Sequence, residues 1–361
     1  MDMEENLRDL GIPTDLCEFI RGPRHIDRSW ESLLVDLVLC LGKITAELAE
    51  NSLNYPSLRK VLDEILALPL EVCLPLDIAN HSKLDLVSNL SHLKNISKRL
   101  AELIVNHTNG ESTIAAIRCQ IHLYSMASKI PLAIGSLTAV ALMQIMLKSV
   151  VHVLSFRTLS TEDIAEFKSA LPIPSISIEE MLIGELGFVY FSQDKGVDDE
   201  NLESWKLAAA ENPAMKSIYF RAKIRHRIPS LDSLCRQIYF NNMCSCIRDL
   251  RKKGDAFQIQ NYRRHMSSKT PKGLLTQFML GSINKTVFET AFQFGPNPGH
   301  VTRWLSETLH ALATPGHSGT KINEPWGFIR VGQSGRESHL LVNSFFGKPL
   351  QLDVVSSQPT T

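Results

Sequence analysis

The segment that decides the fold is CLPLDIANHSKLDLVSNLSHLKNISKRLAEL, which runs from Cys73 to Leu103. Leucines recur in it at positions 86, 90, 93, 100 and 103. These intervals of three, four and seven residues place side chains on one face of an α-helix. The preceding Asn-His-Ser is typical of a helix N-terminus, with Asn80 or Ser82 as the cap. The segment therefore predicts an amphipathic helix that packs against other helices.

The two histidines of this segment, His81 and His92, fit capping and surface roles better than metal binding. His81 precedes the helix, and His92 points about 100° away from Leu93 around the helix axis. The histidines are eleven residues apart, so they are not the i, i+4 pair through which one helix holds a metal ion. We therefore predict no metal site here.

Helical periodicity extends over most of the first two hundred residues. Apolar stripes occupy residues 33–41, 58–66 and 114–124. Ser160 precedes TEDIAEFKSAL, a capping box with Asp163 in place of glutamate, and Ser175 or Ser177 precedes IEEMLIGELGFVYF. Proline and glycine mark short connections, as between antiparallel neighbours. The sequence predicts an all-α fold, an antiparallel helical bundle or array of roughly ten helices with a short C-terminal β-containing tail.

Composition divides the chain into four predicted parts. Residues 1–193 form an N-terminal helical array, and residues 194–211 an acidic linker and connecting segment. Residues 212–313 form a basic C-terminal helical region, and residues 314–361 a tail rich in glycine and proline. This tail holds the short strand-like runs GFIRV, HLLVN and LQLDVV. No fixed-period repeat is visible, so nothing favours a solenoid.

Bulk properties favour a globular protein of the cytoplasm. The chain of 361 residues is 44% hydrophobic and 21% charged, which excludes a disordered chain. Seven cysteines, an odd number, fit reduced thiols better than a disulfide framework. The opening MDMEENLRDL is acidic, unlike a secretory signal. The uncharged run Ile130–Leu147 reaches the shortest membrane span, but its proline and glycine and its amphipathic neighbours favour a buried core helix.

Positive charge gathers in one region, although Lys+Arg and Asp+Glu balance at 38 each. Residues 216–273 hold 14 Lys or Arg against 3 Asp or Glu, with aromatic residues among them. Cations and stacking rings can bind nucleic acid, an acidic protein or an anionic membrane. A solvated face, or docking against the acidic remainder of the chain, is favoured over nucleic acid. The candidate binding residues are Arg221, Lys223, Arg225, Arg227, Arg251, Lys252, Lys253, Arg263 and Arg264.

An enzyme is the less favoured hypothesis. Ser91 and Lys94 match the S-x-x-K pattern of penicillin-recognising serine acyltransferases, and His317 lies in an HSG that resembles their K-T-G position. That fold needs a large antiparallel sheet, and strand signals are almost absent before residue 316. Cys235, Cys244 and Cys246 form a poor zinc pattern, because structural zinc usually binds paired C-x₂₋₄-C motifs. We predict no cofactor and no metal.

Glu185 is the one candidate for a buried polar group, because it lies between Ile183 and Phe188 in a very apolar helix. A buried carboxylate is a candidate for a functional site in principle. An ion pair with a base on a neighbouring helix, such as Arg118, or an exposed position is the favoured explanation.

Several segments, in order, resemble an uncharacterised, mainly helical family that is common in planctomycete genomes. The opening segment is similar to its Phe/Leu-Pro-Leu-Asp turn and Leu-x-x-Leu-x-x-Leu helix, residues 112–154 to its long helical pair, and Gly184, Glu185 and Phe188 to its Gly-Glu-x-x-Phe motif. GLLTQFMLGSINKTVFETAF and NSFFGKPLQLDVV resemble its late apolar helix and its terminal segment. Members commonly begin with a membrane-spanning helix, which this sequence lacks. The family has no established activity, so the resemblance implies only a fold.

The sequence therefore predicts a non-catalytic helical scaffold or protein-interaction module. Its contacts would come from grooves between helices and from the basic face at residues 216–273. A protein partner is favoured, with a nucleic acid or other polyanion and a peripheral membrane contact as the alternatives.

Overall fold

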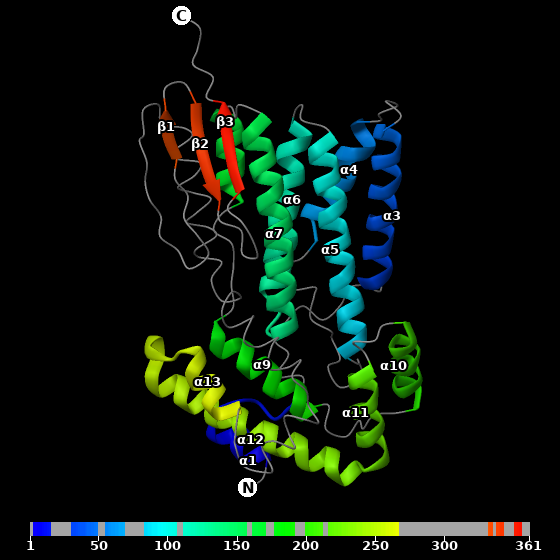
Figure 1. Cartoon of the computed structure of the whole chain (residues 1–361), viewed down its shortest axis with the longest axis vertical. Coiled ribbons are helices and arrows are strands. Elements are labelled where there is room, and N and C mark those ends of the chain that lie inside the picture. The colour runs from blue at the N-terminus through cyan, green and yellow to red at the C-terminus, as the bar shows by residue number, and fades with distance from the viewer. Residues whose placement is uncertain are drawn as a thin grey trace, which may run out of the picture.

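A computed structural model gives the fold of the chain. It describes residues 3–15, 30–49, 55–68, 83–106, 111–156, 161–170, 177–191, 199–211, 216–266, 331–334, 337–342 and 350–355. These residues form a tall helical bundle, a layer of helices across one end of it and a small sheet beside it (Figure 1). The predicted all-α fold with a β-containing tail is confirmed.

Long helices with short connections make up the bundle, and α5 contacts α3, α6 and α7. The connection between α6 and α7 covers only residues 129–132, so these two run antiparallel (Figure 1). The helices of the bundle are α3 (Trp30–Ala49), α4 (Tyr55–Leu66), α5 (Lys83–Asn106), α6 (Glu111–Ser128), α7 (Ala133–Phe156) and α8 (Thr161–Ser169).

The layer at the end of the bundle is built around α12, which contacts α1, α9, α11 and α13. Pro229 occupies the first turn of α12, where its missing N–H costs nothing, and Gly254 ends the helix with a positive φ of 53°. The helices of the layer are α1 (Met3–Asp9), α9 (Ile178–Phe191), α10 (Asp199–Glu211), α11 (Lys216–Arg227), α12 (Pro229–Lys253) and α13 (Ile259–Met266).

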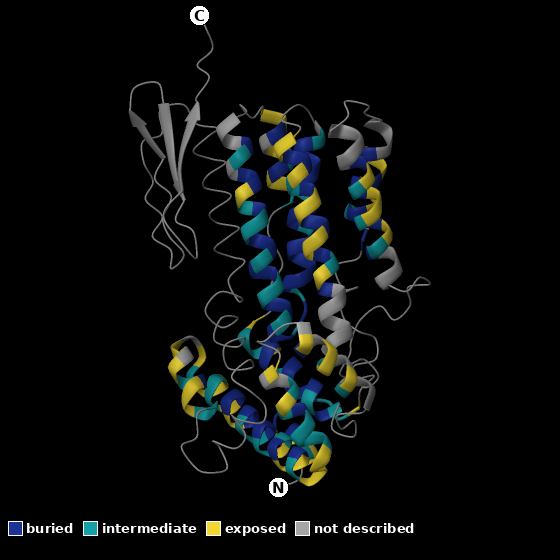
Figure 2. Ribbon diagram, turned by 45° about the vertical axis from the view of Figure 1, so that its right-hand side comes forward, coloured by how far each residue is buried: buried dark blue, intermediate teal, exposed yellow. Residues whose placement is uncertain are grey.

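The predicted leucine stripe forms the centre of the bundle core. Leu93 and Leu100 of α5 are fully buried, with Leu90 and Leu103 nearly so. The burial of each such side chain stabilises the folded state by about 2 kcal/mol. Figure 2 shows buried residues filling the inside of the bundle and exposed residues on its outer faces. We call the buried apolar residues of α3 to α8 and of the turns next to them, without Ala133 but with Phe188 of α9, the first core.

A separate group of buried residues holds the layer together, and it draws on segments far apart in the sequence. Leu7 of α1, Leu186 of α9 and Phe240 of α12 are all fully buried in it. We call this group the second core, and its members are Leu7, Leu10, Ile12, Ala133, Met181, Leu182, Leu186, Tyr190, Tyr239, Phe240, Met243, Cys244, Cys246, Ile247, Phe257 and Tyr262. Helices α1 and α9 therefore pack with the basic region, although the predicted boundary at residue 193 would separate them from it.

Helix α7 is the apolar segment for which a core position was favoured over a membrane span. Its window Ala133–Val150 is apolar enough to cross a membrane by length and composition, with a mean hydropathy of 1.5, and 56% of the window is buried inside the protein. Leu142, Met143 and Met146 are buried in the first core. Contacts with α5 and α6 account for this burial.

The segment predicted to be an acidic linker, 194–211, contains helix α10 instead. Leu202, Trp205 and Ala209 recur at helical spacing, and Ala209 is buried while α10 packs against α11. The segment was predicted to be a linker because the apolar stripe is short and acidic residues surround it. Its exposed side carries an ion pair between Glu203 and Lys206, 2.8 Å long.

Three strands of the tail form an antiparallel sheet in the order β1-β2-β3. The strands are β1 (Val331–Ser334), β2 (Glu337–Val342) and β3 (Leu350–Val355), and β3 contacts α7. Leu340 of β2 lies opposite Val331 and Leu352. The runs HLLVN and LQLDVV are thus confirmed as strands, whereas most of GFIRV lies outside the described residues.

Candidate interaction surface

The corner between α11 and α12 is a rigid turn made by a single residue, Ile228. Its N–H donates to the carbonyl of Ile224 at 3.0 Å, and its own carbonyl accepts from Leu231 at 3.0 Å and Asp232 at 3.2 Å. The last hydrogen bond of one helix and the first of the next therefore meet on this residue, and Pro229 prevents the first helix from continuing.

A buried carboxylate fixes this corner. Asp232 bonds the guanidinium groups of Arg225 on α11 and Arg236 on α12, the latter at 2.9 Å. All three side chains are mostly buried, at 8%, 16% and 14% exposure. Burial lowers the pKa of Arg236, and the charge of Asp232 works in the opposite direction. Arg225, predicted to be a binding residue, is therefore part of the structural support.

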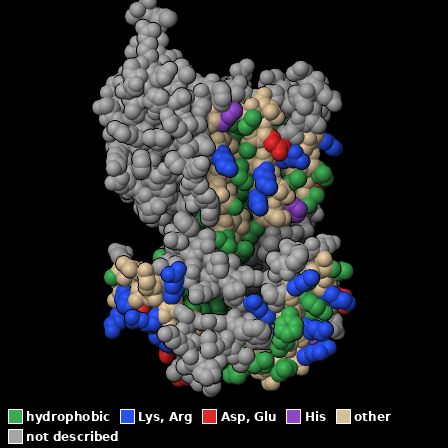
Figure 3. All heavy atoms as spheres, viewed as in Figure 1, with side chains coloured by type: hydrophobic (Ala, Val, Ile, Leu, Met, Phe, Trp, Pro, Cys, Tyr) green, Lys and Arg blue, Asp and Glu red, His purple; other side chains and the backbone are tan. Residues whose placement is uncertain are grey.

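Cations and apolar side chains share the outer face of the corner. Lys216, Phe220, Lys223 and Arg227 recur every four, three and four residues, so they lie on one face of α11. Phe220 is 57% exposed and Ile228 46% exposed. Figure 3 shows hydrophobic side chains among Lys and Arg at this end, at the lower right. We define the corner surface as Lys216, Phe220, Lys223, Arg227, Ile228 and the exposed Leu234 of α12.

At the other end of α12, cations pair with the rest of the chain. Arg251 bonds Glu179 of α9 at 2.8 Å and the carbonyl of Leu10 at 2.6 Å. Arg248 bonds the side-chain oxygen of Asn6 at 2.9 Å. Lys253 instead pairs within α12, where its Nζ lies 2.9 Å from Oδ2 of Asp249. Here the basic segment docks against acidic and polar groups of the protein, as the favoured interpretation predicts.

The structure does not bring the nine predicted binding cations onto one face. Arg221, Lys223, Arg225 and Arg227 lie on α11, whereas the other five follow Leu250, and α12 spans about 37 Å between the two groups. Lys252, Arg263 and Arg264 are exposed at the far end.

The aromatic residues expected among these cations are mostly inside the protein. Residues 216–273 contain six aromatic residues, and four of them are 6% exposed or less and belong to the second core: Tyr239, Phe240, Phe257 and Tyr262. Tyr219 is half-buried, and Phe220 alone of the six is exposed. A row of rings for stacking on bases is therefore not present on the described part of the basic segment.

Glu185 is buried, at 5% exposure, and it caps a helix. Its Oε1 accepts a hydrogen bond from the backbone N–H of Ala133, the first residue of α7, at 3.0 Å. The predicted exposed position is wrong, and Arg118, the example named for an ion pair, bonds Glu166 of α8 at 2.6 Å. The neighbouring Gly184 lies so close to the α6–α7 turn that an added Cβ would stand 1.6 Å from the carbonyl oxygen of Pro131. The contact aims the carboxylate at the helix end, where the dipole favours a negative charge.

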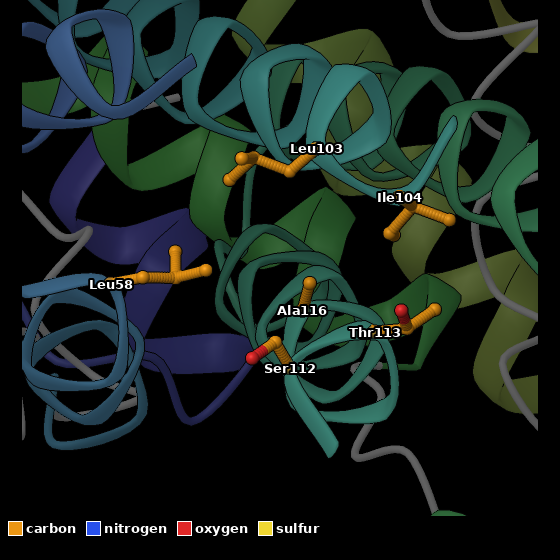
Figure 4. A pocket seen from close by; sticks show the side chains of 6 residues that line it. All are labelled: Leu58, Leu103, Ile104, Ser112, Thr113 and Ala116. Carbon is orange, nitrogen blue, oxygen red and sulfur yellow. The ribbon is translucent and has the colours of Figure 1, made fainter. Parts of the chain in front are cut away.

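The acyltransferase residues Ser91 and Lys94 are exposed on α5, and His317 lies outside the described residues. A small apolar recess of about 10 Å³, partly open to solvent, lies elsewhere in the bundle. Figure 4 shows its lining, which comes from α4, α5 and α6 and contains no ionisable side chain: Leu58, Leu103, Ile104, Ser112, Thr113 and Ala116. This recess offers no acid, base or strong nucleophile.

The three cysteines of α12 are buried thiols. Burial raises the pKa of Cys244 to about 11 and that of Cys246 to about 12, so both stay protonated and unreactive near neutral pH. Within the described ranges no group of three His, Cys, Asp or Glu is arranged to hold a metal ion.

Sequence reasoning missed the support of the corner, Asp232 and Arg236. A signal was available, since Pro229 starts a helix and an acidic residue in its first turn follows a basic stretch. The burial of Asp232 between two arginines depends on the angle at which the helices meet, which the spacing alone does not give.

No protein-family model, curated protein or solved structure matches the chain. The resemblance to the planctomycete family stays a prediction.

Proposed function

We propose that the protein is a non-catalytic helical scaffold that acts by binding a partner through the corner surface. The observation that carries the proposal is the exposure of Phe220 and Ile228 among cations on a corner that is itself rigid. When a partner covers a large apolar side chain that is exposed to water, the free energy of the complex is lowered. The rigid support means that little conformational entropy is lost on binding.

The rival functions have weaker support from the described residues. A nucleic-acid binder that used the nine predicted cations would need them on one face, whereas Arg225, Arg251 and Lys253 take part in ion pairs within the protein. A serine acyltransferase would need Ser91 and Lys94 in a water-excluding site, whereas both side chains are exposed.

Photo-crosslinking in cells tests the proposal. A photoreactive amino acid at position 220 should give a discrete crosslinked product. The same group at position 39 is a matched control, because Leu39 on α3 is 58% exposed against 57% for Phe220. Products of equal yield at both positions, or no crosslink to either protein or lipid at position 220, would show that the corner surface is not a binding surface.

A further inference from the structure

We infer that the corner surface docks on an anionic lipid bilayer. The inference rests on the proposed function and names its partner. Phe220 and Ile228 enter the boundary between headgroups and acyl chains, while Lys216, Lys223 and Arg227 contact the anionic headgroups.

The arrangement of charge and apolar surface on α11 carries the inference. Phe220 has a lysine four residues before it, a lysine three residues after it and an arginine seven residues after it, all on the same face. Lysine and arginine stems can lie along an apolar surface while their charged ends stay in the headgroup region. No acidic residue lies within α11 to oppose this charge.

The shape of the corner favours a bilayer over a protein partner. Ile228 occupies the turn itself, and Phe220 lies two turns before it on the outer face of α11. Side chains at a turn between two helices project, and a bilayer accepts projecting side chains without a complementary pocket. A protein partner would have to supply a matching recess for each of them.

Nucleic acid fits the surface less well. Single-stranded binding sites combine a groove of cations with several exposed rings, and four of the six aromatic residues of the basic segment are buried. The ring of Tyr219 instead lies 5.8 Å from the ammonium of Lys223, within its own helix.

Vesicle sedimentation with the full-length chain tests the inference. The protein should bind vesicles of phosphatidylcholine with about 30% phosphatidylserine and should not bind pure phosphatidylcholine, because the electrostatic part requires anionic lipid. Binding should weaken as salt rises. Lys216→Gln and Arg227→Gln should each weaken it about fivefold.

The apolar part is tested with Phe220→Ser and Ile228→Ser combined, which should lower binding at least tenfold at unchanged helix content. Leu39→Ser, which removes an equally exposed apolar side chain from α3, should leave binding unchanged. Equal loss in both variants would overturn the inference.

Other outcomes separate this inference from the proposed function. Absence of vesicle binding, with a protein crosslinked at position 220, would overturn the lipid inference and leave the proposed function standing. Retention on heparin that matches vesicle binding and survives the Phe220→Ser and Ile228→Ser changes would indicate a polyanion site, and would also overturn it. Failure of both crosslinking and vesicle binding would overturn both.

Discussion

Tyr239 carries a hydroxyl group into the second core, where it has no hydrogen-bond partner among the residues that the structure describes. The residue is 4% exposed and its hydroxyl oxygen is fully buried. Burial, together with the nearby charges of Glu185 and Cys246, raises the pKa of Tyr239, so the hydroxyl stays protonated. An unpaired polar group in a core costs free energy, because it has given up its bonds to water.

Tyr239→Phe should therefore stabilise the protein, by about 1 kcal/mol in urea unfolding. Tyr190→Phe is the matched control, because the Tyr190 hydroxyl donates to Glu4 at 3.3 Å. The control should lose a few tenths of a kcal/mol instead. A loss of stability in Tyr239→Phe would mean that its hydroxyl has a bonding partner after all.

His122 predicts a pH dependence of stability. Its Nε2 lies 2.7 Å from the carbonyl oxygen of Leu68, and burial lowers its pKa below the ordinary 6.5. The unfolded chain therefore binds a proton at a higher pH than the folded one does. The contribution of His122 is complete above about pH 6.5 and is lost as pH falls toward the lower folded pKa.

The free energy of unfolding should thus decrease on acidification from about pH 7 to about pH 5, and the decrease should be smaller in His122→Gln. Urea titrations of the parent protein and the variant at a series of pH values measure the free energy of unfolding at each pH. Identical slopes in the two proteins would exclude His122 as the titrating group.

At the scale of elements, Asp232 holds α11 to α12. Asp232→Ala would leave Arg225 and Arg236 buried and facing each other without a counter-charge. Removing one partner of a buried ion pair costs about 3 kcal/mol, so we expect a loss of that size in urea unfolding. Asp249→Ala should cost clearly less than Asp232→Ala, because Asp249 and its partners Lys253 and His265 are more exposed. Equal losses would contradict the structural role given to Asp232.

Periodicity predicts an element correctly where the same spacing of apolar residues both indicates a helix and marks the side that is buried. Leu90, Leu93, Leu100 and Leu103 of α5 are buried as their spacing predicts. Ser177, one of the two serines expected to begin α9, forms a capping box with Glu180 through bonds of 2.6 and 3.1 Å. The capping box predicted at Ser160 begins outside the described residues. Helix α10 was missed because its apolar stripe is short and surrounded by acidic residues. The candidate surface was only partly predictable, because a charge count does not tell Arg227, which is exposed, from Arg225, which is buried in an ion pair.

At the scale of the whole molecule, the two cores meet where α9 crosses the start of α7. Ala133 belongs to the second core although the buried apolar residues of α7 beyond it belong to the first, and Phe188 of α9 belongs to the first core. The bond from Ala133 to Glu185 and the close approach of Gly184 to Pro131 join the two helices at this point. The sequence could not predict this junction, because the residues that meet are about fifty positions apart.

Glu185→Ala should therefore lower the free energy of unfolding and also make the two cores unfold less cooperatively. The variant leaves a buried N–H at the start of α7 without its partner, which costs about 2 kcal/mol. The parent protein should unfold in one calorimetric transition and the variant in two, because the bond that couples the cores is lost. Glu180→Ala removes an exposed capping carboxylate from the same helix and should lower stability by about 1 kcal/mol without dividing the transition. A single transition in Glu185→Ala, shifted no more than in Glu180→Ala, would mean that the cores are coupled through other contacts.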